Sequence, residues 1–182
     1  MTQPSARSLP GPLAAIVGAV RAHPRLTFAL AVILAGLAVM RLITPPLADV
    51  RDAVEGDCFA GSPLTISANV AGAVHVVPGF ATGIQRVQCS EPHVWESLGL
   101  ATLPGVAGAP YPVNDIESLV SDVCAARFAS FIGRPLAGSE LSVTAFYPIR
   151  DDWETKDERR VACLVVEPGR GPVTGSLRGA NR

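Results

Sequence analysis

One apolar run, Leu26 to Ile43, divides the chain into two parts of opposite character. The 43 residues up to its end carry four arginines and no acidic residue, whereas the remainder carries 11 basic residues, 16 acidic residues and all four cysteines. A helix needs about 20 mostly apolar residues to cross a bilayer, and this run is at the short end of that range. Arg41 can extend its guanidinium to the interface, so the span can include Ile43. The run predicts a transmembrane helix over residues 26–43.

The charges that flank the run predict its orientation. Arg21 and Arg25 precede it, and acidic residues, beginning with Asp49 and Asp52, follow it. Basic residues beside a membrane span favour the cytoplasmic side. We therefore expect residues 1–25 to be a cytoplasmic tail and the C-terminal domain to be extracytoplasmic.

Two other interpretations of the run stay open. A basic region before a short apolar core is also typical of a cleaved signal peptide, although about 25 residues before the core is long for one, and no small-x-small cleavage triplet follows the core before Thr44-Pro45-Pro46. A buried helix of a soluble protein is the other alternative. It fits less well, because the stretch from Leu26 to Met40 has no polar face.

The part that follows the run is long enough for one compact domain and too short for two ordinary ones. Residues 44–55 contain two prolines and mixed charges and are interpreted as a linker, with the domain proper at 56–179. Apolar alternation and turn residues predict strands at 74–77, 85–89, 94–101, 141–147 and 160–166.

One helix is expected in the domain. Asn114 is a suitable N-cap with Glu117 three residues later, and Gly133 is a suitable C-terminal stop. Apolar residues recur at helical spacing between them, so one helix face should be buried. The predicted order is β-β-β-α-β-β. We expect an α+β fold of two layers, with a mostly antiparallel sheet covered by one helix.

The four cysteines predict two disulfides. An even number of cysteines in an oxidising compartment usually pairs, whereas four free thiols would be expected in the cytosol. Cys124 lies on the apolar face of the predicted helix, so it should pair with a cysteine of the sheet, which is Cys58, Cys89 or Cys163. The spacing does not choose among these three partners.

The densest polar cluster is Cys89-Ser90-Glu91-Pro92-His93-Val94-Trp95-Glu96. His93 and Glu96 have the side chains of metal ligands or of an acid/base pair. In a strand, however, residues three apart point to opposite faces, which would separate them. The favoured interpretation is structural, with His93 at the turn and Glu96 in a hydrogen bond or ion pair. The sequence contains no G-x-S-x-G, H-E-x-x-H, C-x-x-C or phosphate-binding glycine motif, so no enzyme activity is expected.

A mixed-charge run surrounds Trp153, from Arg150 to Arg160. Such a run is usually a solvated hairpin loop with its tryptophan packed on the sheet. The functional alternative is a partner-binding tip, because exposed aromatic residues framed by arginines are common at interfaces. Nucleic-acid binding is not expected, since the domain is net acidic.

Six elements in order resemble the septum formation family of actinobacterial membrane proteins with extracytoplasmic domains. They are Gly56-Asp57-Cys58-Phe59, the stretch from Val87 to His93 with Glu96, Cys124 with Phe128, Phe131 and Gly133, Pro148 with Trp153, Arg160 with Cys163, and Thr174-Gly175-Ser176-Leu177-Arg178-Gly179. The resemblance covers about residues 56–179. It implies a role near septation or the cell envelope and supplies no catalytic residues.

The sequence therefore favours a membrane-anchored, extracytoplasmic interaction module that binds an envelope or division protein, with no cofactor and no metal. His93, Glu96 and Trp153 are its candidate binding residues. The first alternative is a sensor for a small envelope ligand, which would need a cleft lined by Phe128, Phe131 or Trp153. The second is an enzyme or metal site at His93 and Glu96.

Overall fold

The computed structural model describes residues 28–36, 47–61 and 70–182, and the chain divides into two units, Met1–Thr44 and Pro45–Arg182. In the first unit, residues 28–36 form a helix, and Phe28, Leu30, Val32, Ile33 and Leu34 are exposed on it. The tail 1–25 and the rest of the expected transmembrane segment, 26–27 and 37–43, lie outside the described residues. Within the described ranges, no helix has both the length and the apolar character needed to cross a membrane.

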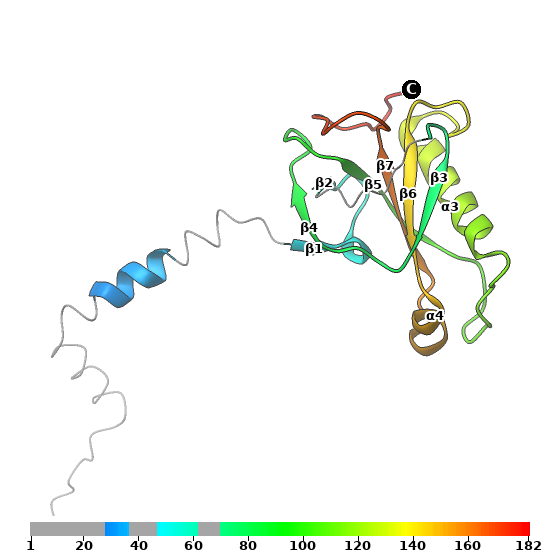
Figure 1. Ribbon diagram of the computed structural model, residues 1–182, viewed down its shortest axis with the longest axis horizontal. Coiled ribbons are helices and arrows are strands. Elements are labelled where there is room, and N and C mark those ends of the chain that lie inside the picture. Colours follow the sequence, from blue (N-terminus) through cyan, green and yellow to red (C-terminus); the bar gives the residue numbers. More distant parts are fainter. Residues whose placement is uncertain (1–27, 37–46, 62–69) are drawn as a thin grey trace, which may run out of the picture. The chain divides into compact units, whose positions relative to one another are not determined.

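The second unit is built on a sheet that contains seven strands in the described part of the chain (Figure 1). The strands are β1 (Leu47–Asp49), β2 (Cys58–Ala60), β3 (Val74–Pro78), β4 (Thr82–Val87), β5 (Trp95–Thr102), β6 (Ser142–Tyr147) and β7 (Arg160–Val166). Their order across the sheet is β1-β4-β2-β5-β7-β6-β3. Only β3 and β6 pair in parallel; the other neighbours are antiparallel. The predicted α+β class and mostly antiparallel sheet are confirmed.

Helix α3 (Ile116–Ile132) covers one face of the sheet, as predicted (Figure 1). It ends at Gly133, which has a left-handed φ of 91° that glycine adopts without a steric penalty. Its start differs from the prediction. Asp115, not Asn114, is the N-cap, and its side chain makes no capping hydrogen bond. The helix is therefore stabilised mainly by the packing of its buried face on the sheet.

The sheet is buried on its other face as well. Along β7, Val161, Cys163 and Val165 pack in the cluster that contains α3. The alternate residues of β7 belong to a second cluster, whose members are Val50, Ala53, Phe59, Ile84, Trp95, Phe146, Ala162, Leu164 and Val166. Because side chains alternate between faces along a strand, β7 is a central strand covered on both sides.

Two expectations about loops are wrong. Residues 47–55 are not a free linker, because β1 pairs with β4 and the short 3-10 helix η1 (Val50–Asp52) places Val50 fully inside the second cluster. The ordered domain therefore begins before Gly56. The charged run is not a hairpin loop either: helix α4 (Arg150–Lys156) connects β6 to β7, and Asp157 ends it with a left-handed φ of 53°.

Candidate functional site

A disulfide joins Cys58 of β2 to Cys89, just after β4, with a Cα–Cα distance of 5.2 Å. Strand β2 lies between β4 and β5, and the register sets Cys58 opposite Glu96 of β5. Directly opposed residues of an antiparallel pair project their side chains to the same face. The disulfide is therefore next to the carboxylate of Glu96.

Glu96 is buried, with 1% of its surface exposed, and both of its carboxylate oxygens accept hydrogen bonds. Ser176 Oγ donates to Oε1 at 2.5 Å, and the amide of Leu177 donates to Oε2 at 2.5 Å. The amide of Arg178 then donates to Ser176 Oγ at 3.1 Å. Burial of a carboxylate is tolerated only where donors surround it, and the closing T-G-S-L-R-G segment supplies them here.

His93 lies in the turn that precedes β5. Its backbone exchanges two hydrogen bonds with Val173, at 2.9 and 2.8 Å, and forms an isolated antiparallel bridge. Its ring Nδ1 lies 2.8 Å from the carbonyl oxygen of Glu91. The other ring nitrogen, Nε2, is buried and has no hydrogen-bond partner among the described residues.

These groups form one cluster, which we call the motif cluster: Cys58, Cys89, His93, Glu96 and Ser176. Single ligand atoms of Cys58, His93 and Glu96 all lie within 4.8 Å of one another. The expectation that strand geometry separates His93 from Glu96 is wrong, because β5 begins only at Trp95 and His93 is not part of it. The turn contact expected for His93 and the hydrogen bonds expected for Glu96 are both present.

Residues 174–182, which we call the C-terminal segment, continue from the motif cluster to the end of α3. The amide of Gly179 donates to the carbonyl of Phe131 at 2.9 Å, and that of Asn181 donates to Ile132 at 3.1 Å. The last carbonyls of a helix lack partners within it, so these two bonds cap α3. Arg178 adds a contact with the ring of Phe131, 4.1 Å from its centroid. The segment thus links β5 to the helix.

The second disulfide joins Cys124 of α3 to Cys163 of β7, with a Cα–Cα distance of 5.5 Å. Cys124 therefore pairs with a sheet cysteine, as predicted, and Cys163 is the partner that the spacing did not single out. Both cysteines are fully buried. This disulfide fastens the helix layer to the central strand of the sheet, which adds about 2–4 kcal/mol to a small domain.

Trp153 does not have the exposure that a partner-binding tip requires, since it is 2% exposed. Its Nε1 donates to the carbonyl of Ala109 at 2.7 Å, the guanidinium of Arg159 lies 3.6 Å from its ring centroid, and Tyr111 packs edge-on at 5.7 Å. Trp153 thereby fixes α4 and the loop around Ala109 to each other. Its role in this structure is packing.

A carboxylate that the sequence did not single out lies at the end of β7. Glu167 is 8% exposed and accepts two hydrogen bonds from the guanidinium of Arg182, at 2.8 and 2.7 Å. Arg170 lies 2.8 Å from the same carboxylate. The bonds from Arg182, with the charges of both arginines, hold the pKa of Glu167 below its usual value. Only the fold brings the chain's last residue to this position.

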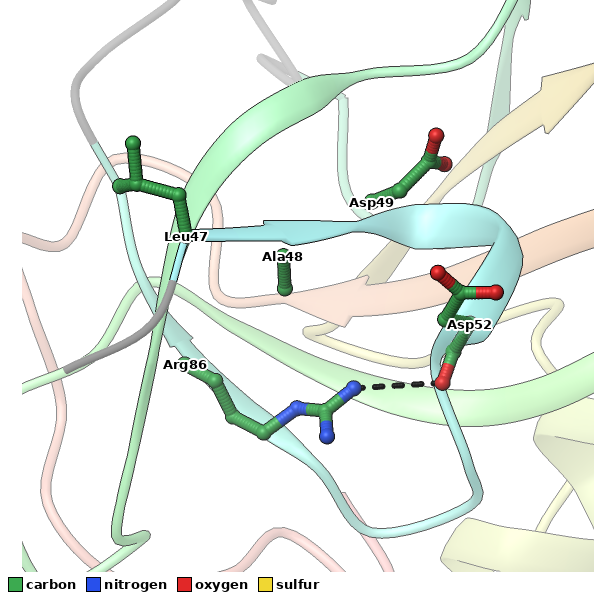
Figure 2. Close-up of a pocket in the computed structure, with 5 residues that line it drawn as sticks. All are labelled: Leu47, Ala48, Asp49, Asp52 and Arg86. Carbon is green, nitrogen blue, oxygen red and sulfur yellow. Dashed lines mark hydrogen bonds between the residues drawn. The ribbon is translucent and has the colours of Figure 1, made fainter. Parts of the chain in front are cut away.

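A groove of about 210 Å³ lies beside the edge strand β1. Figure 2 shows the residues that line it, Leu47, Ala48, Asp49, Asp52 and Arg86. Arg86 points across it and donates to the carbonyl oxygen of Asp52 at 3.2 Å. Hydrogen bonds from Arg51 lower the pKa of Asp49, which keeps its carboxylate charged. The groove therefore offers charged groups on an accessible surface.

The cleft that a small-ligand sensor would need is not formed by the residues proposed for it. Phe128 and Phe131 are 0% and 4% exposed, and both fill the core beneath α3, while Trp153 is packed as described above. A second concavity, of about 440 Å³, lies between β5 and α3 and is lined by Ala101, Thr102, Val123, Ala126, Arg127 and Ser130.

The fold and the motif cluster define a small α+β domain held by two disulfides and closed by its own C-terminal segment. A family model described as Septum formation matches residues 74–181, and the chain belongs to this family. The match begins after β2, so Cys58 lies outside it, although its partner Cys89 lies within. Searches of curated proteins and of solved structures found no match. Family membership associates the chain with cell division.

Proposed function

We propose that this protein is a single-pass membrane protein whose extracytoplasmic domain binds an envelope or division protein during septum formation, and that it catalyses no reaction. Membership of the septum formation family supports the link with septation. The apolar run after a tail whose only charges are arginines supports the anchor and its orientation. Two disulfides support an oxidising compartment for the domain.

The burial of His93 and Glu96 in the motif cluster is the observation that supports a protein without catalytic activity. A general acid or base must reach the proton that it transfers in a substrate. His93 and Glu96 are each 1% exposed, and both Glu96 oxygens already accept bonds from the C-terminal segment. Side chains that are buried to this extent lie out of reach of a substrate at the protein surface.

The groove beside β1 is the surface that we assign to the partner. Small-molecule sites usually bury most of their ligand in a concave, largely apolar pocket. This groove is small, with three charged residues, Asp49, Asp52 and Arg86, in its lining and the exposed side chain of Leu47 beside them. Charged rims around a few apolar side chains are typical of protein interfaces.

Localisation of fluorescent fusions in the native cell tests the proposal. The tag is placed at the cytoplasmic N-terminus of three chains: the full protein, a chain in which an unrelated single-pass anchor of the same orientation replaces residues 1–43, and residues 1–55 alone. We expect the first two to concentrate at the septum and the third to spread over the membrane. A full-length fusion that is evenly distributed, or an anchor segment that localises by itself, would contradict the role assigned to the domain.

The partner surface is tested by charge reversal in the groove. Arg86→Glu reverses one charge there, and Arg134→Glu is a matched control on an equally half-buried arginine outside the groove. We expect Arg86→Glu to reduce septal localisation at unchanged protein level, and Arg134→Glu to leave it unchanged. Arg86 also contacts Asp57 at 3.1 Å, so the protein level of each variant is measured beside its localisation.

A further inference from the structure

The motif cluster contains a buried imidazole nitrogen, His93 Nε2, that has no hydrogen-bond partner among the described residues. A carbonyl oxygen only accepts hydrogen bonds, so the contact of 2.8 Å between His93 Nδ1 and the carbonyl of Glu91 requires the proton on Nδ1. In the neutral ring Nε2 then carries the free lone pair, and it has no partner among the described residues although His93 is 1% exposed. Metal-binding histidines have this arrangement, with one ring N–H held by a carbonyl and the other nitrogen free to coordinate.

Two other ligand types lie beside the His93 ring. Cys58 and Glu96 each have a ligand atom within 4.8 Å of the one offered by His93, and all three residues are buried. The carboxylate oxygens of Glu96 each accept one bond, from Ser176 and from Leu177, and each retains a second lone pair. Ligating carboxylates are commonly oriented by hydrogen bonds of this kind.

While the Cys58–Cys89 disulfide is intact, its sulfur atoms are not available as metal ligands. A metal binds the thiolate form of cysteine, and Cys58 Sγ is bonded to Cys89 Sγ. A dithiol reductant of the thioredoxin class would supply two electrons and two protons to this bond and would itself become a disulfide. Cys58 and Cys89 would become thiols, and a metal ion that coordinates them would release their protons to water.

We propose that the motif cluster is a thiol-dependent Zn²⁺ site, closed while the Cys58–Cys89 disulfide is intact and formed by Cys58, Cys89, His93 and Glu96 when it is reduced. Thiolate, imidazole and carboxylate ligands in a set of four suit tetrahedral Zn²⁺. Zinc bonds of about 2.0–2.3 Å place tetrahedral ligand atoms roughly 3.3–3.8 Å apart. The ligand atoms of Cys58, His93 and Glu96 now lie within 4.8 Å of one another, so metal binding requires these side chains to close by about 1 Å.

The two disulfides differ in access to a reductant. Cys124 and Cys163 are fully buried, whereas Cys89 is partly exposed. Attack on a disulfide requires access to one of its sulfur atoms. Reduction therefore reaches the Cys58–Cys89 bond first and leaves the helix fastened to the sheet.

The Cys89→Ser variant of the full chain, purified in detergent without reductant, tests the site. This change frees the Cys58 thiol and leaves the Cys124–Cys163 disulfide in place. We expect it to bind one equivalent of Co²⁺, with a thiolate-to-cobalt charge-transfer band that Zn²⁺ abolishes, and we expect oxidised wild type to show no such band. Adding His93→Gln should weaken binding by about tenfold or more, since it removes a ligand. Adding His75→Gln, on β3, is the matched control and should leave binding unchanged.

A Cys89→Ser protein that retains its second disulfide and the circular dichroism of wild type, yet binds no Co²⁺, would overturn the proposal. Equal binding with and without His93→Gln would also overturn it. If the variant does not fold, partially reduced wild type provides the measurement: Zn²⁺ should slow the alkylation of Cys58 and Cys89. Alkylation at the same rate with and without Zn²⁺ would overturn the site. None of these results depends on where the protein localises.

Discussion

Ser176 Oγ donates a hydrogen bond to Glu96 Oε1 at 2.5 Å, across a separation of 80 residues. The neighbouring amide of Leu177 donates to the second oxygen. Glu96 is thus the residue on which the C-terminal segment is fixed to the sheet. Two of the six elements that carried the family resemblance, one around His93 and one around Ser176, therefore meet at the buried carboxylate of Glu96.

Removal of the serine hydroxyl should destabilise the domain. Ser176→Ala deletes a bond to a buried carboxylate, and we expect it to lower the free energy of unfolding by about 1–3 kcal/mol. Urea unfolding of the full chain in detergent, followed by tryptophan fluorescence, measures this change. Ser121→Ala is the matched control, since its exposed hydroxyl bonds only to the carbonyl of Glu117 within α3. Equal effects of the two substitutions would contradict the role given to Ser176.

The C-terminal end of helix α3 predicts that alanine is tolerated less well at Gly133 than at Gly138. A Cβ at Gly133 would lie 2.8 Å from Asn181 Oδ1, whereas a Cβ at Gly138 would meet nothing within 4 Å. Both have positive φ, of 91° and 76°, so alanine is strained at either site. We expect Gly133→Ala to lower the melting temperature more than Gly138→Ala, because it also displaces the C-terminal segment. Thermal unfolding by circular dichroism measures both, and a larger effect at Gly138 would be inconsistent with this packing.

The Glu167 ion pair predicts a pH-dependent contribution to stability. The pKa of Glu167 is lowered in the folded state by its bonds with Arg182, so the folded state favours the charged carboxylate. The contribution is fully present above the unfolded value, near 4.5, and is lost as the pH falls through the lower folded value. Because Arg182 is about one-third exposed, we expect no more than about 1 kcal/mol.

Unfolding free energies of wild type and Glu167→Gln between pH 7 and pH 3 measure this contribution. The difference between the two proteins should be constant down to about pH 5 and should then shrink. Glu117→Gln serves as the control, because this side chain is exposed in the first turn of α3, and we expect its curve to follow that of wild type. A difference that grows with acidity would have the wrong sign for the ion pair.

The buried position of Trp153 predicts a structural phenotype. Trp153→Phe removes the bond from Nε1 to the carbonyl of Ala109, and we expect a loss of about 1 kcal/mol in unfolding free energy. The indole of Trp153 should also be poorly quenched by iodide in the folded protein. Its fluorescence is obtained as the difference between wild type and Trp153→Phe. Strong quenching of that component would mean that Trp153 is exposed and would restore it as a candidate contact for a partner.

The sequence predicted the elements whose signals are local. β7 has the predicted bounds, Arg160 to Val166, because a continuous apolar run between a charged segment and Pro168 permits little else. Gly133 marks the end of α3 because a left-handed stop favours glycine. β1 and β2 have three residues each, too few to show an alternation, and their pairing with β4 and β5 is decided by the fold.

The candidate site required long-range information. Treating His93 and Glu96 as members of one strand separated them, but the strand starts between them, at Trp95. Their proximity to Cys58 depends on β2 lying between β4 and β5, and the donors to Glu96 come from the other end of the domain. Trp153 was ambiguous because a tryptophan among charged residues suits both a packed and an exposed position, and only the contacts with Arg159 and Tyr111 decide between them.

Disulfide mapping of the full-length protein from native membranes tests the central claim, an oxidised domain outside a retained anchor. The sample is blocked with an alkylating reagent, digested without reduction and analysed by mass spectrometry. We predict peptides that link Cys58 to Cys89 and Cys124 to Cys163, together with intact peptides that contain residues 26–43. Four alkylated cysteines would contradict the extracytoplasmic position, and an N-terminus that begins after residue 43 would contradict the anchor.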